Sequence, residues 1–176
     1  MKRTLFSICA LVLSLTASAQ IIKDTPKGKL IENLYRSSKS WVKKGWTGVQ
    51  PGRYEGLVSK IVIGEDGCIY IYNPLSGLDS KSWLKLERQP DGKYRAKLPQ
   101  DILTDDLGGD DDDEESSERT ITLNRMVSSD DGKNYEPVGP ALNYVDFTVE
   151  GRTLKMSGMG QKKQIWGATY NNSWLN

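Results

Sequence analysis

The sequence predicts an all-β fold, an antiparallel meander that forms a sandwich or a barrel. Turn signals separate short β-prone runs along most of the chain, and apolar residues alternate with polar ones inside several runs. Each turn has an acidic residue near a glycine, and glycine supplies the positive φ that tight hairpin turns require. The turns are Glu65-Asp66-Gly67, Pro90-Asp91-Gly92, Asp130-Asp131-Gly132 and Glu150-Gly151.

Each turn joins two predicted strands. The pairs are residues 57–63 with 68–72, 83–88 with 93–98, 120–127 with 133–138, and 144–149 with 152–156. In the last pair Val145, Phe147 and Val149 alternate with polar residues, which predicts one buried face and one face in water. Pro74 and Pro99 each end a strand, because proline cannot donate to a ladder.

The segment 29–44 is predicted to form one short N-terminal helix. Its apolar residues fit a helical stripe, although its serines are poor residues for a helix interior. An N-terminal edge strand is the alternative. The apolar residues of this stripe are Leu30, Ile31, Leu34, Tyr35, Trp41 and Val42.

Residues 1–19 are predicted to be a secretory signal peptide. Lys2 and Arg3 precede an apolar stretch, and Ala17-Ser18-Ala19 provides a cleavage signal before Gln20. The stretch is too short for a bilayer core of about 30 Å, so no transmembrane segment is expected after cleavage. The protein is therefore expected in the periplasm, on the outer cell surface or outside the cell, with residues 20–176 as a single β-rich domain.

Composition excludes several kinds of protein. The chain has 176 residues, a formal net charge of +1 and no histidine. Without histidine it has no imidazole base and no histidine-ligated metal, and its balanced charge argues against a nucleic-acid partner. After cleavage Cys68 is the remaining cysteine, and its place in a predicted strand indicates a buried, inert thiol.

Carboxylates crowd into residues 105–118, which are predicted to be a disordered acidic loop because like charges repel and stay solvated. Asp110, Asp112 and Glu114 have the spacing of calcium ligands, which makes a weak cation site the alternative. However, Glu115 stands where the EF-hand loop needs glycine, and Ile121 stands where its last carboxylate belongs. No metal or other cofactor is expected.

Aromatic residues are the other chemical resource, with 5 Trp and 8 Tyr in the chain. Both types have an apolar body and a polar tip, which suits binding surfaces. Tyr70 and Tyr72 share a strand face and, with Trp83, are candidates for a platform that stacks on a sugar ring. The alternative is that these rings simply fill a core.

Two stretches resemble an uncharacterised exported β-rich domain of secreted or surface proteins from anaerobic Gram-negative commensal bacteria. One runs over residues 61–76 and contains Gly64-Glu65-Asp66-Gly67, and the other is the closing segment 165–172. This resemblance implies an exported β protein and carries no catalytic residues.

The function expected from all of this is a non-enzymatic binding or structural module of a cell-envelope protein. Its partner is expected to be a glycan or another envelope protein. A carbohydrate-binding module is the first alternative. A hydrolase is less favoured, because no two carboxylates are linked as an acid/base pair. A small-ligand carrier is expected if the meander encloses an apolar cavity.

Overall fold

The computed structural model describes residues 20–43, 49–75, 80–104, 118–130, 134–157, 164–170 and 173–174, with side chains undescribed in 33–43, 49–58, 164–170 and 173–174. The predicted signal peptide and all but the last residue of the acidic loop lie outside these ranges. Within them the chain forms strands and one short 3-10 helix, η2 (Pro140–Leu142). The all-β prediction is confirmed.

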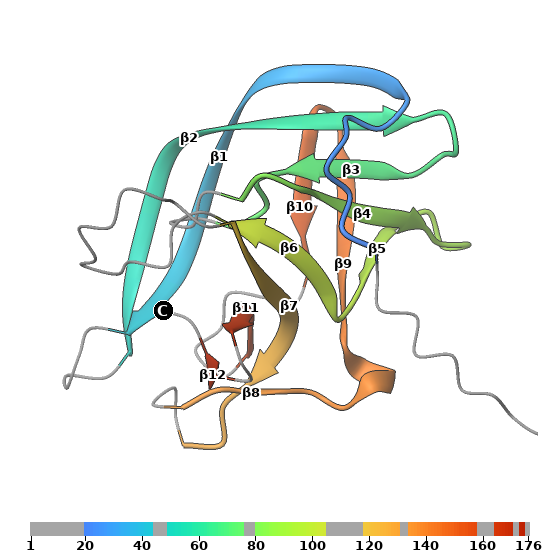
Figure 1. Cartoon of the computed structure of the whole chain (residues 1–176). Helices are drawn as coiled ribbons and strands as arrows, with labels where there is room; N and C mark the ends of the chain where they lie inside the picture. The colour runs from blue at the N-terminus through green and yellow to red at the C-terminus, as the bar shows by residue number, and fades with distance from the viewer. Residues whose placement is uncertain are drawn as a thin grey trace, which may run out of the picture.

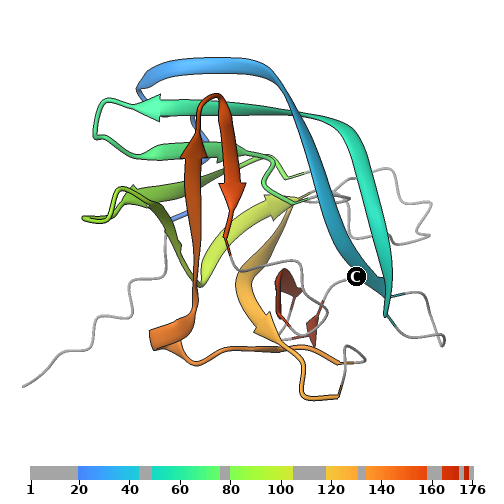
Figure 2. The same cartoon turned by 180° about the vertical axis from the view of Figure 1, so that it is seen from behind.

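Two antiparallel sheets make up the described fold, and Figure 1 shows them one above the other. The large sheet has the order β1-β2-β3-β4-β5-β9-β10 and curls into a half-barrel. The hairpin of β9 and β10 lies behind β2 and β3 in Figure 1 and in front of them in Figure 2. The small sheet has the order β12-β11-β7-β6, with β8 beside β7.

The strands of the large sheet are β1 (Gly28–Lys43), β2 (Val49–Gly64), β3 (Ile69–Tyr72), β4 (Trp83–Arg88), β5 (Tyr94–Lys97), β9 (Tyr144–Glu150) and β10 (Thr153–Met156). Those of the small sheet are β6 (Gln100–Thr104), β7 (Arg119–Val127), β8 (Glu136–Pro137), β11 (Gln164–Tyr170) and β12 (Ser173–Trp174). The four predicted hairpins are confirmed as β2–β3, β4–β5, β7–β8 and β9–β10. Gly67, Gly92 and Gly151 have the positive φ that their turns require.

The predicted N-terminal helix is wrong, and the edge-strand alternative is correct. Residues 28–43 form β1, which pairs antiparallel with β2 along its length. The register shifts between Ile31 and Leu34 and again between Arg36 and Ser38. These irregularities break the alternation of period two, so the apolar spacing resembled that of a helix. Pairing with β2 outweighs the weak helix propensity of the segment.

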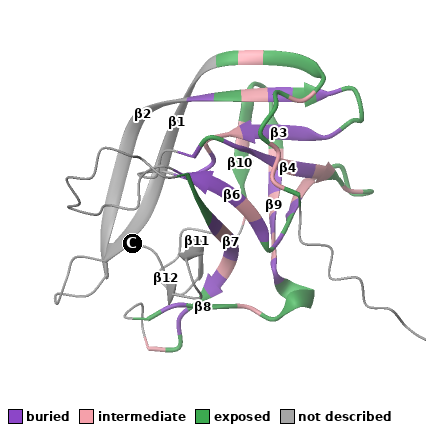
Figure 3. Cartoon of the chain, viewed as in Figure 1, coloured by how far each residue is buried: buried purple, intermediate pink, exposed green. Residues whose placement is uncertain are grey.

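Consecutive residues of β3 and β4, at the centre of the large sheet, are buried (Figure 3), and because side chains alternate along a strand, both faces are covered there. The inner face carries the main core, in which Leu84, Leu86 and Phe147 join Ile102 and Ile121 of the small sheet. On the outer face a second cluster forms from Val62, Cys68, Tyr70 and Trp83, and Ile22 packs against it. The sheet is therefore sandwiched between the small sheet and the N-terminal segment.

The two sheets separate after β5, which pairs with Glu87 and Arg88 of β4. Gln100 takes the place of the missing strand partner beside Lys85. Its side-chain amide accepts from the Lys85 N–H at 3.4 Å and donates to the carbonyls of Lys85 and Lys97 at 3.3 and 2.9 Å. The amide thus replaces a neighbouring strand for Lys85, whose backbone groups are part of a buried ladder. Pro99 lies at this separation, between the end of β5 and the start of β6.

Two other polar side chains join the sheets in the same manner. Asn143 is buried, accepts from the Arg125 N–H at 2.8 Å and donates to the Asn124 side chain at 2.9 Å. The Ser82 hydroxyl is fully buried and accepts from the Leu103 N–H at 3.0 Å. Each side chain satisfies a backbone or side-chain group that no strand partner reaches.

We expect Gln100→Met to lower the free energy of unfolding by about 2 kcal/mol, because it leaves buried backbone groups of Lys85 without a partner. Urea unfolding followed by tryptophan fluorescence measures this change. Gln89→Met is the matched control, since Gln89 lies at the β4–β5 turn and donates one bond to the Glu87 carbonyl. Equal losses in the two variants would contradict the role given to Gln100.

Candidate functional site

The three residues predicted to form an aromatic platform lie together on the outer face, but they do not form an exposed platform. Tyr70 is 8% exposed and Trp83 is 4% exposed. The rings of Tyr72 and Trp83 lie 5.1 Å apart with their planes at 58°. The platform prediction is wrong because the N-terminal segment covers this face. Ile22 packs against the cluster, and the backbone N–H of Trp83 donates to the Ile22 carbonyl at 2.9 Å. The rings fill a core.

A polar cluster at the β2–β3 turn holds Tyr70 in place. The Tyr70 hydroxyl donates to Asp66 at 2.7 Å, the Cys68 N–H donates to the other Asp66 oxygen at 3.0 Å, and Lys85 lies 3.5 Å away. The bonds from Tyr70 and Cys68 lower the pKa of Asp66 to about 2. Burial, and then the bond to Asp66, raises the pKa of Tyr70 to about 12. Burial also raises the pKa of Cys68, as expected of the predicted inert thiol.

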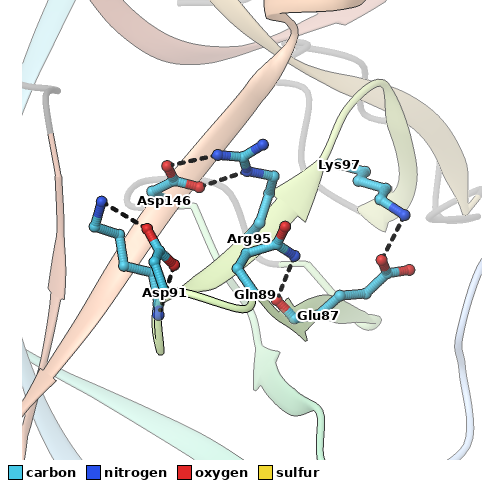
Figure 4. Close-up of polar contacts among 7 residues, drawn as sticks. Glu87, Gln89, Asp91, Arg95, Lys97 and Asp146 are labelled. Atoms are coloured by element: carbon cyan, nitrogen blue, oxygen red, sulfur yellow. Dashed lines mark hydrogen bonds and ion pairs between the residues drawn. The ribbon is translucent and has the colours of Figure 1, made fainter.

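Charged residues occupy the outer face of β4, β5 and β9 (Figure 4). Arg95 donates two hydrogen bonds to Asp146, at 2.7 and 2.9 Å, and its guanidinium stacks 3.7 Å from the centre of the Tyr144 ring. Lys97 pairs with Glu87 at 2.6 Å. Glu87 and Asp146 thus each face a cation and not each other, an arrangement that stabilises the sheet rather than forming an acid/base pair.

The cation site predicted at Asp110, Asp112 and Glu114 lies outside the described residues. Glu118, at the edge of the acidic run, is described and pairs with Lys23 at 2.8 Å. In the described ranges, no three His, Cys, Asp or Glu residues gather closely enough to hold a metal ion. The same ranges contain no helix with the length and apolar character needed to cross a membrane.

The feature that sequence reasoning missed is a set of exposed apolar residues on the core face of the large sheet, one each in β2, β9 and β10. Ile63, Val149 and Met156 are 44%, 52% and 40% exposed. We call these three residues the apolar rim. They lie on the inner face of the large sheet, because Ile63 pairs with Ile69 and Met156 pairs with Phe147, both core residues.

Val149 is exposed because β9 continues past the start of β5, and Met156 is exposed because β10 is the edge strand of the sheet, whereas Ile63 has a paired strand on each side. β5 begins at Tyr94, which pairs with Phe147, so β9 continues to Val149 with β10 as its partner. Leu154, the partner of Val149, packs against the core together with Ile61 and Tyr94. The alternation of β9 correctly placed Val149 on the core face, but strand length decides which core-face residues reach solvent, and alternation does not give it.

Comparison with known proteins gives no relative for this chain: no protein-family model, curated protein or solved structure matches it. The resemblance to exported β-rich domains of commensal bacteria therefore stays a prediction. The functional argument rests on the geometry of the chain itself.

We expect Asp66→Asn to lower the free energy of unfolding at pH 7 by less than about 1 kcal/mol, since the carboxylate is half exposed and screened. The folded-state pKa of Asp66 is depressed from 3.8 to about 2. Its contribution is therefore fully present above about pH 4 and is lost as the pH falls through about 2. Urea titrations at a series of pH values test this. The difference between variant and wild type should shrink below pH 4, and a difference independent of pH would refute the assignment.

Proposed function

We propose that the chain is an exported, non-enzymatic binding module that takes an apolar ligand at the apolar rim. The observation that carries the proposal is the exposure of Ile63, Val149 and Met156 on a face that is otherwise core. Exposed apolar side chains mark an interaction site when they form a contiguous patch, and Val149 and Met156 lie on the same face of adjacent strands. Ile63 lies in β2, near one edge of the large sheet, and Val149 and Met156 lie in the β9–β10 hairpin at its other edge.

The size of the rim sets the affinity to expect. Burying a large aliphatic side chain contributes roughly 1.5–3 kcal/mol, and each rim residue is already about half buried. A ligand that covers all three thus gains about 3 kcal/mol here, with more from the half-buried Ile61, Tyr94 and Leu154. Association also has an entropic cost, and a millimolar Kd already corresponds to about 4.1 kcal/mol, so contact with these side chains alone gives weak binding in the millimolar range.

Export is the second part of the proposal, and it rests on the charged start, the apolar stretch and Ala17-Ser18-Ala19. The single remaining cysteine, Cys68, is buried, so packing rather than a disulfide within the chain stabilises the mature domain. A fold that is stabilised by packing and whose thiol is buried can exist in an oxidising compartment.

The apolar rim is tested by titration with N-phenyl-1-naphthylamine, an uncharged probe that fluoresces in apolar surroundings. We expect saturable binding by the protein of residues 20–176, weakened at least tenfold in the double variant Val149→Asp, Met156→Asp. Both side chains are exposed, so the variant should keep the circular dichroism of the wild type.

Leu142→Asp is the control for that titration. Leu142 is 58% exposed in η2, away from the rim, so its variant should bind the probe as the wild type does. Equal weakening by both changes would mean unspecific binding and would refute the proposed site. A blank titration with saturable binding to a glycan array would favour the carbohydrate-binding alternative.

Export predicts a defined N-terminus. Expressed with residues 1–19 in a Gram-negative host, the protein should appear outside the cytoplasm with Gln20 as its first residue. N-terminal sequencing of the fractionated protein measures this. Ala17→Pro, Ala19→Pro should block cleavage and leave the precursor, whereas mature-length wild type confined to the cytoplasm would count against export.

A further inference from the structure

The N-terminal segment 20–27 is held to the rest of the fold by contacts at two successive residues. The Trp83 N–H donates to the Ile22 carbonyl at 2.9 Å, and Ile22 packs against the cluster on the outer face of the large sheet. The Lys23 ammonium pairs with Glu118 at 2.8 Å. We call residues 20–27 the N-terminal strap, and its contact at Ile22 closes the outer face.

Gln20 is the exposed end of this strap. It lies outside the strands, whereas Ile21 and Ile22 after it are half-buried. Cleavage after Ala19, as proposed above, makes Gln20 the first residue and gives it a free α-amine. The free end of the strap then lies two residues before the residue that anchors it.

A glutamine with a free α-amine can close on itself, because part of that amine is unprotonated near neutral pH. The amine nitrogen attacks the side-chain Cδ and forms a C–N bond, while the bond from Cδ to the amide nitrogen breaks. A proton passes from the amine to the leaving nitrogen, so ammonia departs and a five-membered lactam, pyroglutamate, remains. The reaction needs no co-reactant. It needs a side chain that can fold back over its own amine, and an exposed Gln20 can do so.

The lactam has a specific consequence for this fold. Aminopeptidases need a free α-amine, and the removal of three residues would take away Ile22. The Trp83 N–H would then lose its acceptor, and the cluster on the outer face would lose the side chain that packs against it. A cyclised Gln20 has no free amine, so it protects the contact that closes this face.

We propose that Gln20 is a modification site, cyclised to pyroglutamate after cleavage, and that the lactam protects the N-terminal strap from exopeptidases. The enzyme that this exposed chain end suits is a glutaminyl cyclase. The inference rests on the proposed export and adds the chemical state of the mature N-terminus.

The first test follows cyclisation by intact-protein mass, since a lactam blocks stepwise chemical sequencing. Protein of residues 20–176, released from a fusion partner so that it begins at Gln20, is incubated with a glutaminyl cyclase. We expect it to lose the mass of one ammonia molecule at a rate within about fivefold of that of a free peptide of residues 20–24. Gln20→Asn is the matched control, because its shorter side chain would need a strained four-membered ring and should keep its mass. A folded protein that reacts more than fivefold more slowly than the peptide would overturn the inference.

The second test treats the cyclised wild type and Gln20→Asn with an aminopeptidase of broad specificity. We expect the cyclised protein to keep its full mass, and Gln20→Asn to lose residues up to Ile22, with a change in tryptophan fluorescence. Equal resistance of the two proteins would overturn the protective role. Both tests start from the released chain, so their failure leaves the proposed export standing, and the N-terminus of the fractionated protein decides export separately. A precursor that keeps residues 1–19 would refute both.

Discussion

The fold depends on satisfying backbone groups where the two sheets part. A sheet that curls and then passes its chain to a second sheet must leave some N–H and C=O groups without a strand partner. Gln100, Asn143 and Ser82 supply those partners from buried side chains at the junction. The main core lies between the sheets at this junction, with residues from both. The core is buried only when the two sheets meet, and the sheets meet only where these side chains provide hydrogen bonds to the unpaired backbone groups.

The same junction explains why the half-barrel has an accessible end. The small sheet covers the inner face of the large sheet with Ile102, Ile121 and Leu123. At the other end β9 continues past the start of β5, and there Val149 emerges from the core face into solvent. The outer face is closed by the N-terminal segment and by paired charges such as Arg95 and Asp146.

The sequence predicted the hairpins well because each turn is a local signal. Gly67, Gly92 and Gly151 are needed for their φ values, and no long-range contact changes that. The first strand could not be predicted in the same way. Its register shifts after Ile31 and after Arg36 hide the alternation, and its pairing with β2 is a tertiary contact that no local pattern indicates. The platform failed for a related reason: the strand pattern placed Tyr70 and Tyr72 on one face, but only the fold shows that residues near Ile22 cover it. Of the candidate site, alternation gave the face of Val149, while the exposure of its side chain depends on the lengths and register of β5 and β9.

The central claim is that the exposed core-face residues Ile63, Val149 and Met156 bind an apolar ligand. The most direct measurement is a methyl-resolved NMR titration of the labelled protein with N-phenyl-1-naphthylamine. The account predicts saturable shifts concentrated in the methyl groups of Ile63, Val149 and Met156, with Leu30 and Leu142 unchanged although they are equally exposed. Shifts spread evenly over all exposed apolar residues, or none at all, would contradict it.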